Sequence, residues 1–291
     1  MKAVAMLNGQ FVDIDQPLIH IEDRGYQFGD GVYEVVPIME GRLVGFDYHM
    51  ERLTRSLREI KIPAVYTHEE LLEFHVEMMK EGNIYNGNIY MQITRGTCPR
   101  NHQFPDQVIP VMTMVGRAKD YDTIRKHQEE GVKLLSTPDI RWHRCDIKTL
   151  NLLGNVLCKQ KAIDAGFYDA LLYRENGNVT EGSSSNFSVI KDGVIWTHPD
   201  GDLILPGCTK RIILKDLCPK LDIPVVEKAF SMEFAKAADE AFLSASSYCP
   251  MPVVKIDKNV IKDGKPGPLT NKIKEAFDKY VQNLKPVLEK S

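Results

Sequence analysis

RWHRCDIKTLNLL, residues 141–153, places one lysine, Lys148, between a strand-like approach and a mainly apolar helix that the spacing predicts over 149–163. The apolar side of that helix would comprise Leu150, Leu153, Val156 and Leu157. A lysine at such a junction is partly desolvated, and desolvation frees the amine lone pair that Schiff-base chemistry requires. An ordinary solvated lysine fits the same letters, so this stretch alone leaves both interpretations open.

The composition indicates a soluble globular protein rather than one that binds nucleic acid or membranes. The chain has 291 residues, 43% hydrophobic and 26% charged, which suits two domains. Its formal net charge is -3 with no basic block, which argues against nucleic acid and anionic membranes as partners. The N-terminus lacks a signal-peptide pattern and no segment is apolar enough to span a membrane, so we expect a cytoplasmic protein. Six cysteines without CxxC spacing predict neither a metal site nor a disulfide framework.

Turn and periodicity signals predict a mixed α+β fold that begins with a small α+β domain over 1–118. Asn8-Gly9 between apolar runs favours a type I′ hairpin of strands 4–7 and 11–14. Thr67 and Glu70 form a capping-box pattern at the start of a helix, and Pro37 indicates an edge or bulged strand. Other expected elements are strands 33–38, 43–46, 88–94 and 108–115 and a helix around 50–60. The polar stretch 119–130 has little apolar content and is predicted to be the linker.

The rest of the chain, 131–291, is predicted to be a larger, strand-rich domain. Asn176-Gly177 and Asp192-Gly193 each favour a hairpin. The expected strands are 132–136, 169–174, 186–190, 194–197, 241–244 and 253–256, followed by a terminal helix over 270–284.

Glu181 follows a predicted strand within VTEGSSSNF, residues 179–187. An acid at a strand end, before a run of glycine and serines, can reach the ring of a cofactor while hydroxyls and amides cradle its polar groups. A carboxylate at a pyridine nitrogen would keep that nitrogen protonated. A turn with a capping acid is the alternative, and only the presence of Lys148 favours the first interpretation.

Three places offer groups for a phosphate. LPGCT, residues 205–209, opens a helix whose free amides can bind an anion, with a hydroxyl from Thr209, although a threonine N-cap is also common. A hydroxyl cluster over 244–247 follows the strand 241–244. Arg52 lies among apolar neighbours on the helix around 50–60 and is either a phosphate partner or part of a solvated helix face.

TRGTCPRNHQFP, residues 94–105, predicts a carboxylate-binding loop. Arg100 offers a planar fork of donors that matches two carboxylate oxygens, and His102 adds a further donor two residues away. The flanking prolines, Pro99 and Pro105, reduce the entropy lost when the loop closes on a ligand. Tyr33, in a glycine-rich stretch, is either a third member of this trap or a core tyrosine.

Together these motifs resemble the class IV, branched-chain-type aminotransferase family, and most closely its D-amino-acid transaminase branch. The motifs, in order, are RGYQFGDGVYEV, ITRGTCPRNHQFP, CDIKTLNLL, VTEGSSSNF and LPGCTK. The resemblance runs from the first hairpin to the serines near Ser246. It implies the two-domain pyridoxal-phosphate architecture known as fold type IV, a cofactor-binding role for the C-terminal domain, and a homodimer with its active site at the subunit interface.

The resemblance also implies a role for each matching position. Lys148 would be the catalytic residue, bind pyridoxal 5'-phosphate as a Schiff base and move the proton at the substrate Cα. Glu181 would face the pyridine nitrogen and Leu205 would brace the ring. The phosphate would be held by Arg52, Cys208, Thr209 and Ser246. The substrate would contact Tyr33, Arg100, His102 and Ser247, with Arg100 and His102 donated by the partner subunit.

The Arg100-Asn101-His102 triplet separates the activities within the family. A carboxylate held by this trap fixes which substituent of Cα faces Lys148, and this favours exchange of an amino group between a D-amino acid, such as D-alanine, and a 2-oxo acid, such as 2-oxoglutarate. Branched-chain L-transamination and aminodeoxychorismate lyase activity on the same fold are the alternatives. A binding protein that has lost catalysis is a third, against which the presence of Lys148 and Glu181 argues. The sequence Ala245-Ser246-Ser247 departs from the Ser-Thr-Thr pattern of the family but keeps two hydroxyls.

Overall fold

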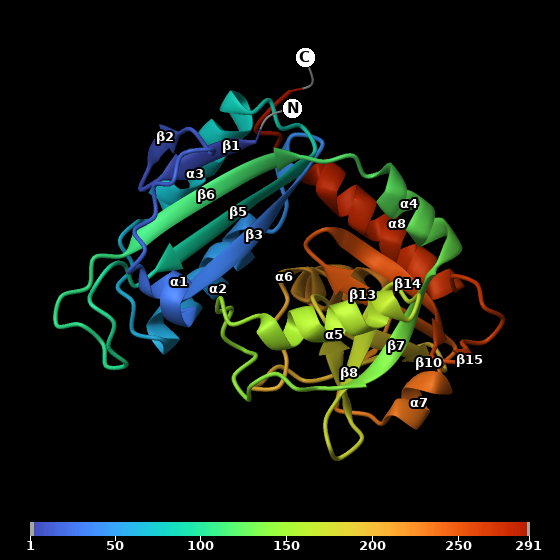
Figure 1. Ribbon diagram of the computed structural model, residues 1–291. Helices are drawn as coiled ribbons and strands as arrows, with labels where there is room; N and C mark the ends of the chain where they lie inside the picture. Colours follow the sequence, from blue (N-terminus) through green and yellow to red (C-terminus); the bar gives the residue numbers. More distant parts are fainter. Residues whose placement is uncertain (1–2, 290–291) are drawn as a thin grey trace. The chain divides into compact units, whose positions relative to one another are not determined.

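In the computed structural model, which describes residues 3–289, the chain divides into two compact units (Figure 1). Unit 1 takes the chain up to Asp120, together with Ile147–Asn151 and the residues from Val281 onward. Unit 2 takes Tyr121–Asp146 and Leu152–Tyr280. The sequence predicts one continuous C-terminal domain over 131–291. The structure differs, because two segments within that range belong to unit 1.

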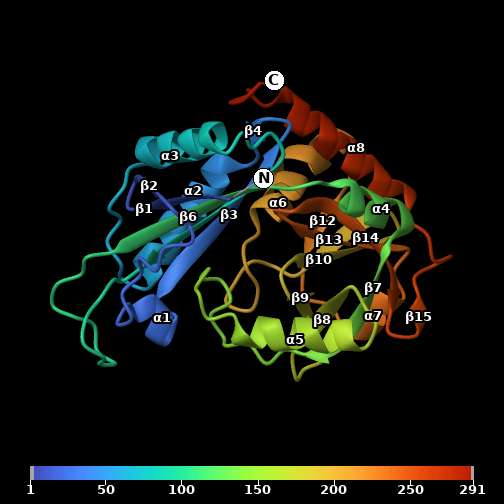
Figure 2. The same ribbon diagram turned by 45° about the horizontal axis from the view of Figure 1, so that its top comes forward.

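Unit 1 is built on a wholly antiparallel sheet in the order β2-β1-β6-β5-β3-β4. Its strands are β1 (Val4–Leu7), β2 (Gln10–Val12), β3 (Gly31–Met39), β4 (Arg42–Leu43), β5 (Gly87–Thr94) and β6 (Val111–Ala118). Its helices are α1 (Arg24–Phe28), α2 (Phe46–Glu59) and α3 (His68–Glu81). Figure 2 shows α2 and α3 along the same face of this sheet.

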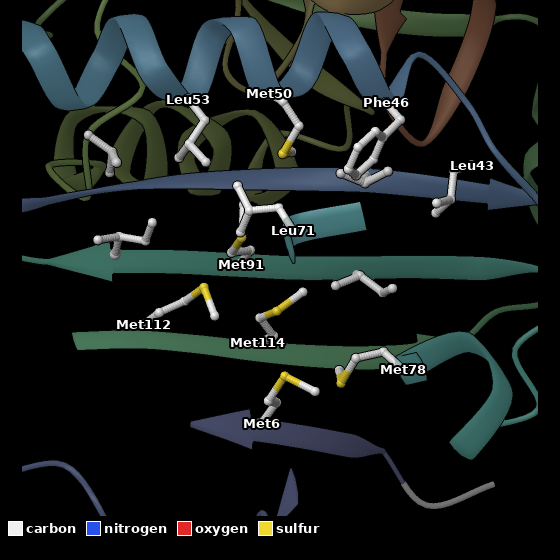
Figure 3. Packing of buried hydrophobic residues seen from close by; sticks show 14 of the residues in the cluster. Met6, Leu43, Phe46, Met50, Leu53, Leu71, Met78, Met91, Met112 and Met114 are labelled. Carbon is white, nitrogen blue, oxygen red and sulfur yellow. The ribbon is translucent and has the colours of Figure 1, made fainter. Parts of the chain in front are cut away.

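The core of unit 1 lies between that face and the two longer helices (Figure 3). Strand β5 alternates buried and half-buried residues, so Ile89, Met91 and Ile93 face the helices. They meet the apolar stripe of α2, which includes Met50 and Leu53. The half-buried residues between them, such as Tyr90, point to the opposite face.

Local signals in unit 1 are confirmed where a turn or cap is self-contained. Asn8 and Gly9 have φ of 48° and 82°, as a type I′ turn requires. The Thr67 side chain accepts from the Glu70 N–H, while the Glu70 side chain accepts from the Thr67 N–H, which completes the capping box. The strand expected over 43–46 is shorter, because Phe46 already begins α2.

Unit 2 is built on a mixed sheet in the order β12-β11-β10-β13-β14-β7-β8-β9, with β15 paired to β14. Its strands are β7 (Val132–Pro138), β8 (Asp169–Tyr173), β9 (Val179–Gly182), β10 (Asn186–Lys191), β11 (Val194–Thr197), β12 (Val225–Glu227), β13 (Glu240–Ala245), β14 (Tyr248–Ile256) and β15 (Asn259–Val260). Its helices are α4 (Asp122–Glu130), α5 (Leu153–Asp164), α6 (Cys208–Arg211) and α7 (Met232–Lys236), and α8 (Pro268–Asn283) ends beyond its boundary. From α6 the chain continues as a π-helical turn, Ile212–Leu217, and a 3-10 turn, Cys218–Leu221.

One prediction for this part of the chain is wrong, and a second has the right element with the wrong start. The segment 119–130 is not a linker, since most of it forms α4, whose Ile124 packs on the unit 2 core and whose Gln128 amide donates to the Pro250 carbonyl at 2.8 Å. The helix expected over 149–163 begins at Leu153, and its buried side is Cys158 and Ala162 against β8. The apolar residues Leu153, Val156 and Leu157 are exposed.

Candidate active site

Lys148 lies on the segment Ile147–Asn151, which runs along the edge of β3. The Tyr33 N–H donates to the Lys148 carbonyl at 3.0 Å, and the Leu150 N–H donates to the Gly31 carbonyl at 3.1 Å. Strand β4 pairs only with Ile38 and Met39, which leaves this edge open. The backbone groups of 147–151 are engaged at the sheet edge, and this explains why the helix starts only after them.

The Lys148 side chain is half-buried and lies over an aromatic ring. Its Nζ is 4.2 Å from the centroid of the Tyr33 ring. Tyr33 in turn stacks on Tyr90 at 5.6 Å, and the Tyr90 hydroxyl donates to the Gln92 side chain at 2.7 Å. Burial raises the pKa of Tyr90 to about 12, so this group stays a neutral donor. The structure thus brings Lys148 and Tyr33 together, as a pair rather than as two separate features.

Arg52 is not part of a solvated helix face but belongs to a buried ion-pair cluster in unit 1. Its Nε and Nη2 donate to the two oxygens of Glu34 at 2.9 and 2.8 Å, and His49 Nδ1 is 2.7 Å from Glu34 Oε2. Glu34 has no exposed area. Burial works to raise the pKa of Glu34, but the Arg52 charge and hydrogen bonds hold it well below its usual range. The sequence analysis missed Glu34, although its place between Val32 and Val36 put it on the helix-facing side of β3.

Replacing Glu34 by glutamine should lower the free energy of unfolding of the apoprotein by about 3–5 kcal/mol at pH 7, because the Arg52 guanidinium loses its buried counter-charge. The pKa of Glu34 is lower in the folded protein than in the unfolded chain. The stabilisation of the folded protein by ionised Glu34 is therefore complete above the ordinary pKa of a glutamate. It is lost as the pH falls toward the lower pKa that Glu34 has in the folded protein. Urea unfolding at pH 7 and at about pH 4 should show a smaller loss of stability on acidification for Glu34→Gln than for the parent.

The control is Glu129→Gln, on the exposed side of α4, which should follow the parent at both pH values. Parallel losses in Glu34→Gln and the parent would show that Glu34 does not contribute to the acid sensitivity.

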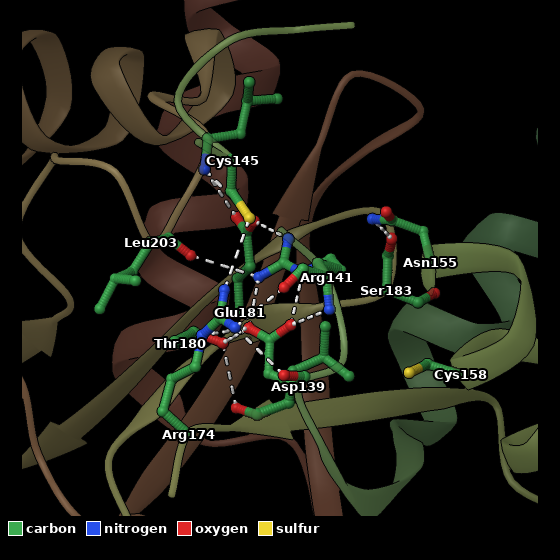
Figure 4. Close-up of polar contacts among 12 residues, drawn as sticks. Asp139, Arg141, Cys145, Asn155, Cys158, Arg174, Thr180, Glu181, Ser183 and Leu203 are labelled. Atoms are coloured by element: carbon green, nitrogen blue, oxygen red, sulfur yellow. Dashed lines mark hydrogen bonds and ion pairs between the residues drawn. The ribbon is translucent and has the colours of Figure 1, made fainter. Parts of the chain in front are cut away.

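Glu181 is the penultimate residue of β9 in unit 2 and is held by several donors, of which Figure 4 labels Arg141. The Arg141 guanidinium donates to its Oε1, the Asn186 amide donates to its Oε2 at 2.8 Å, and the Leu205 N–H lies 3.2 Å from both oxygens. Burial raises the pKa of Glu181, and the Arg141 charge opposes that increase. The Leu205 N–H is shared between the two oxygens, so each oxygen has one donor of its own and part of a third.

A second layer fixes the direction of Arg141. Asp139 accepts from Arg141 Nε and Nη2 at 2.9 and 2.8 Å, from the Thr180 hydroxyl at 2.9 Å, and lies 3.2 Å from Arg174 Nε. Burial acts against the charge of Arg141, but attraction from Glu181 and Asp139 raises the pKa of Arg141 further above its usual value. The sequence analysis named Glu181 alone. Arg141 and Asp139 lie some 40 residues away from it along the chain, and no local pattern pairs them.

The candidate phosphate groups of unit 2 lie at two turns. Cys208 and Thr209 are buried at the start of α6, and Ser246 and Ser247 occupy the turn between β13 and β14. Gly207 precedes α6, where a Cβ atom would meet the Asn186 side-chain oxygen at 1.8 Å. Because Asn186 also binds Glu181, this glycine lets the α6 turn and the carboxylate approach each other.

Arg100 and His102 gather around another residue, Phe28, at the end of α1. The Arg100 guanidinium carbon is 4.5 Å from the Phe28 ring centroid, and the His102 ring lies 5.6 Å from it. Arg100 and His102 are both exposed. The two members of the predicted trap are thus together in one subunit, while Tyr33 contacts Lys148.

Within residues 3–289, no three His, Cys, Asp or Glu side chains are grouped as a metal ion would need. No helix in the same range combines the length and apolar character that a membrane span requires.

Comparison with known proteins gives consistent relatives. The family model for amino-transferase class IV matches residues 31–256. The chain is 45% identical to a D-alanine aminotransferase of Staphylococcus epidermidis over 95% of this chain and 97% of the relative, and 41% identical to one of Listeria monocytogenes over 94% of each. The branched-chain amino acid aminotransferase of Escherichia coli superimposes with a TM-score of 0.89 at 24% identity, over 96% and 94% of the chains, which shows the fold type IV architecture alone.

Proposed function

The chain belongs to the class IV aminotransferases, and from this premise we propose that it is a pyridoxal-phosphate-dependent D-amino-acid transaminase. It would exchange the amino group between a D-amino acid, such as D-alanine, and a 2-oxo acid, such as 2-oxoglutarate. The observation that carries the proposal is the similarity to D-alanine aminotransferases, which are 45–46% identical over nearly the full length of both chains. The pairing of Arg100 with His102 on one loop supports the same choice.

The described residues fit pyridoxal 5'-phosphate. Glu181 is a buried carboxylate of the kind that can accept from a ring N–H, unit 1 offers the half-buried amine of Lys148, and cationic and hydroxyl groups suited to a phosphate come from Arg52 and Thr209. When bound, this cofactor supplies an electron sink that makes the substrate Cα proton acidic.

Lys148 is the residue that we assign to proton transfer. Its amine would hold the cofactor covalently until substrate arrives, then accept the proton from Cα and return it at C4′ of the cofactor. The Tyr33 ring under Nζ limits the positions of this long side chain. A positioned amine is what both steps need.

Glu181 would accept a hydrogen bond from the ring nitrogen and keep that nitrogen protonated. Arg141 fixes the carboxylate, and Asp139 fixes Arg141, so the acceptor atom is held without a flexible link. Leu205, whose N–H also binds Glu181, would brace the ring.

The phosphate would be bound by Arg52, Cys208, Thr209 and Ser246. Arg52 reaches this role already oriented by Glu34, and the α6 residues would supply backbone amides and a hydroxyl. Ser247, in the same turn as Ser246, would face the substrate side chain.

Tyr33, Arg100 and His102 would bind the substrate carboxylate. Once the carboxylate is fixed, the enantiomer whose Cα hydrogen points at Lys148 is the one that loses a proton, and this is the physical basis for D-specificity. We place Arg100 and His102 in the active site of the partner subunit of a homodimer. The exposed apolar side of α5, where Leu153, Val156 and Leu157 are 71%, 57% and 53% exposed, supports such an interface. We also propose that the enzyme works in the cytoplasm.

The test is a spectroscopic half-reaction with the purified, cofactor-loaded protein. D-alanine and L-leucine are added separately, without a 2-oxo acid, and the visible absorption of the bound cofactor is followed. We expect D-alanine alone to convert the spectrum to that of the aminated cofactor. Conversion by L-leucine alone would contradict the trap assignment and favour a branched-chain enzyme.

A further inference from the structure

The ring of Phe28 is shared by side chains from two places in unit 1. Arg24 lies 4.7 Å and Arg100 4.5 Å from its centroid, and the His102 ring is tilted against it at 5.6 Å. We propose that Phe28 is a positioning residue for substrate carboxylate binding, which holds Arg100 and His102 in a common orientation before substrate arrives. This inference rests on the proposed function, because it deepens the role of the same two residues.

Beyond Thr97, which forms a single β-bridge with Asp23, the loop that carries Arg100 is held by side chains rather than by strand pairing. It lies between β5 and β6, and its residues 98–110 form no helix or strand. Arg24 Nη1 donates to the Asn101 carbonyl at 2.6 Å and to the Gln103 carbonyl at 3.4 Å. The carbonyl groups on either side of His102 are therefore bound by a residue of α1 that is only 3% exposed.

A half-buried carboxylate ties this arrangement to the sheet. Asp30 accepts from Arg24 Nε at 2.7 Å and from Arg95 Nε and Nη2 at 2.8 and 3.0 Å. Burial works against the charge, but the two guanidinium groups hold the pKa of Asp30 below its usual range. The Arg95 guanidinium also lies 3.7 Å from the centroid of Phe104, near the middle of the loop. The central part of the loop is thus held by one charge network.

Phe28 connects that network to the residues that would meet the substrate. Arg24 is fixed by Asp30, whereas Arg100 and His102 are exposed and would otherwise sample many rotamers. The negative face of an aromatic ring attracts a guanidinium, and a ring also packs against an imidazole. Holding the two donors on one ring removes part of the entropy that carboxylate binding would cost.

Phe28→Leu keeps an apolar side chain but removes the aromatic face, and Phe28→Tyr keeps the face. We expect Phe28→Leu to raise the KM for D-alanine about three- to tenfold, with kcat within about twofold of the parent, because a carboxylate contact made equally before and during reaction affects KM alone. Phe28→Tyr should stay close to the parent. D-alaninol, which has an amine but no carboxylate, should be equally poor with the parent and Phe28→Leu.

Two controls separate positioning from general damage. Phe11→Leu, the same change at an exposed site on β2, should leave both constants unchanged. In an Arg100→Ala background, Phe28→Leu should raise KM much less than it does in the parent, since its effect acts through Arg100. Equal effects in both backgrounds, or a matching loss with D-alaninol, would overturn the proposal.

Limited trypsin digestion tests the arrangement without any reaction. Cleavage after Arg100, mapped by mass spectrometry, should be several-fold faster in Phe28→Leu than in Phe11→Leu, because the loop is less restrained. Unchanged cleavage would show that Phe28 does not hold the loop. If the parent fails to react with D-alanine, the proposed function fails, and this digestion still decides whether Phe28 holds Arg100.

Discussion

Lys148→Ala should reduce turnover of D-alanine with 2-oxoglutarate by at least about 10³-fold, because the same amine is assigned both the covalent and the proton-transfer step. The structure predicts that the variant still folds. The bonds from the Lys148 backbone to Tyr33 and Ser56 do not involve the side chain, and the half-buried Nζ contacts a ring face rather than a buried charge. Steady-state kinetics and thermal unfolding of the two proteins measure these expectations.

A covalent readout makes this prediction independent of turnover. Borohydride treatment of the cofactor-loaded parent should fix the cofactor mass on the peptide that contains Lys148, and the alanine variant should carry no such label. Lys258→Ala, at an exposed position between β14 and β15, is the matched control and should behave as the parent. A label on another lysine, or full turnover by Lys148→Ala, would remove Lys148 from the mechanism.

Features determined by a few neighbouring residues could be predicted from the sequence. The turns at Asn8-Gly9 and Asp192-Gly193 have positive φ at both residues, and the Thr67 capping box forms as expected. These motifs depend on backbone conformation and hydrogen bonds within four residues, so tertiary context does not override them. Glu240 shows the limit of such patterns, since it binds the first N–H groups of α8 from β13, about 30 residues away.

The errors arise where partners are chosen by the folded chain. Residues 119–130 look like a linker because α4 buries little beyond Gln128 and packs through Ile124. Helix α5 shows a different limit, because the spacing identifies its apolar side but not the exposure of Leu153 and Val156 on it. Composition identifies an apolar side but does not say whether a second subunit covers it.

In the candidate site, too, the local motifs could be predicted and the tertiary contacts could not. Lys148 and Glu181 could be named because their motifs are local and ordered along the chain. Glu181 is oriented by Arg141 and Asp139, which lie outside β9. Arg52 is bound by Glu34, which belongs to another element, β3. Their roles follow from buried charge, because each buried carboxylate needs donors that only the fold can bring.

Subunit complementation tests whether the trap acts between the subunits of the proposed homodimer. Arg100→Ala should lower kcat/KM for D-alanine by about 10- to 100-fold through loss of a charged hydrogen bond, and Lys148→Ala should be inactive. Copies of the two variants carrying different tags are co-expressed, and the heterodimer is purified on both tags. If Arg100 serves the partner's Lys148, one of the two sites is intact, and the heterodimer should have about half the parent kcat/KM.

The matched control carries the same two substitutions in a different arrangement. One subunit has both Arg100→Ala and Lys148→Ala, and its partner has neither. With a trap shared between subunits, the one remaining Lys148 faces the substituted loop, so this heterodimer should have at most about a twentieth of the parent kcat/KM. A trap acting within one subunit reverses the result, because the control then keeps a complete site and the first heterodimer has none. The arrangement of the substitutions, at equal composition, therefore decides which subunit supplies the carboxylate-binding residues.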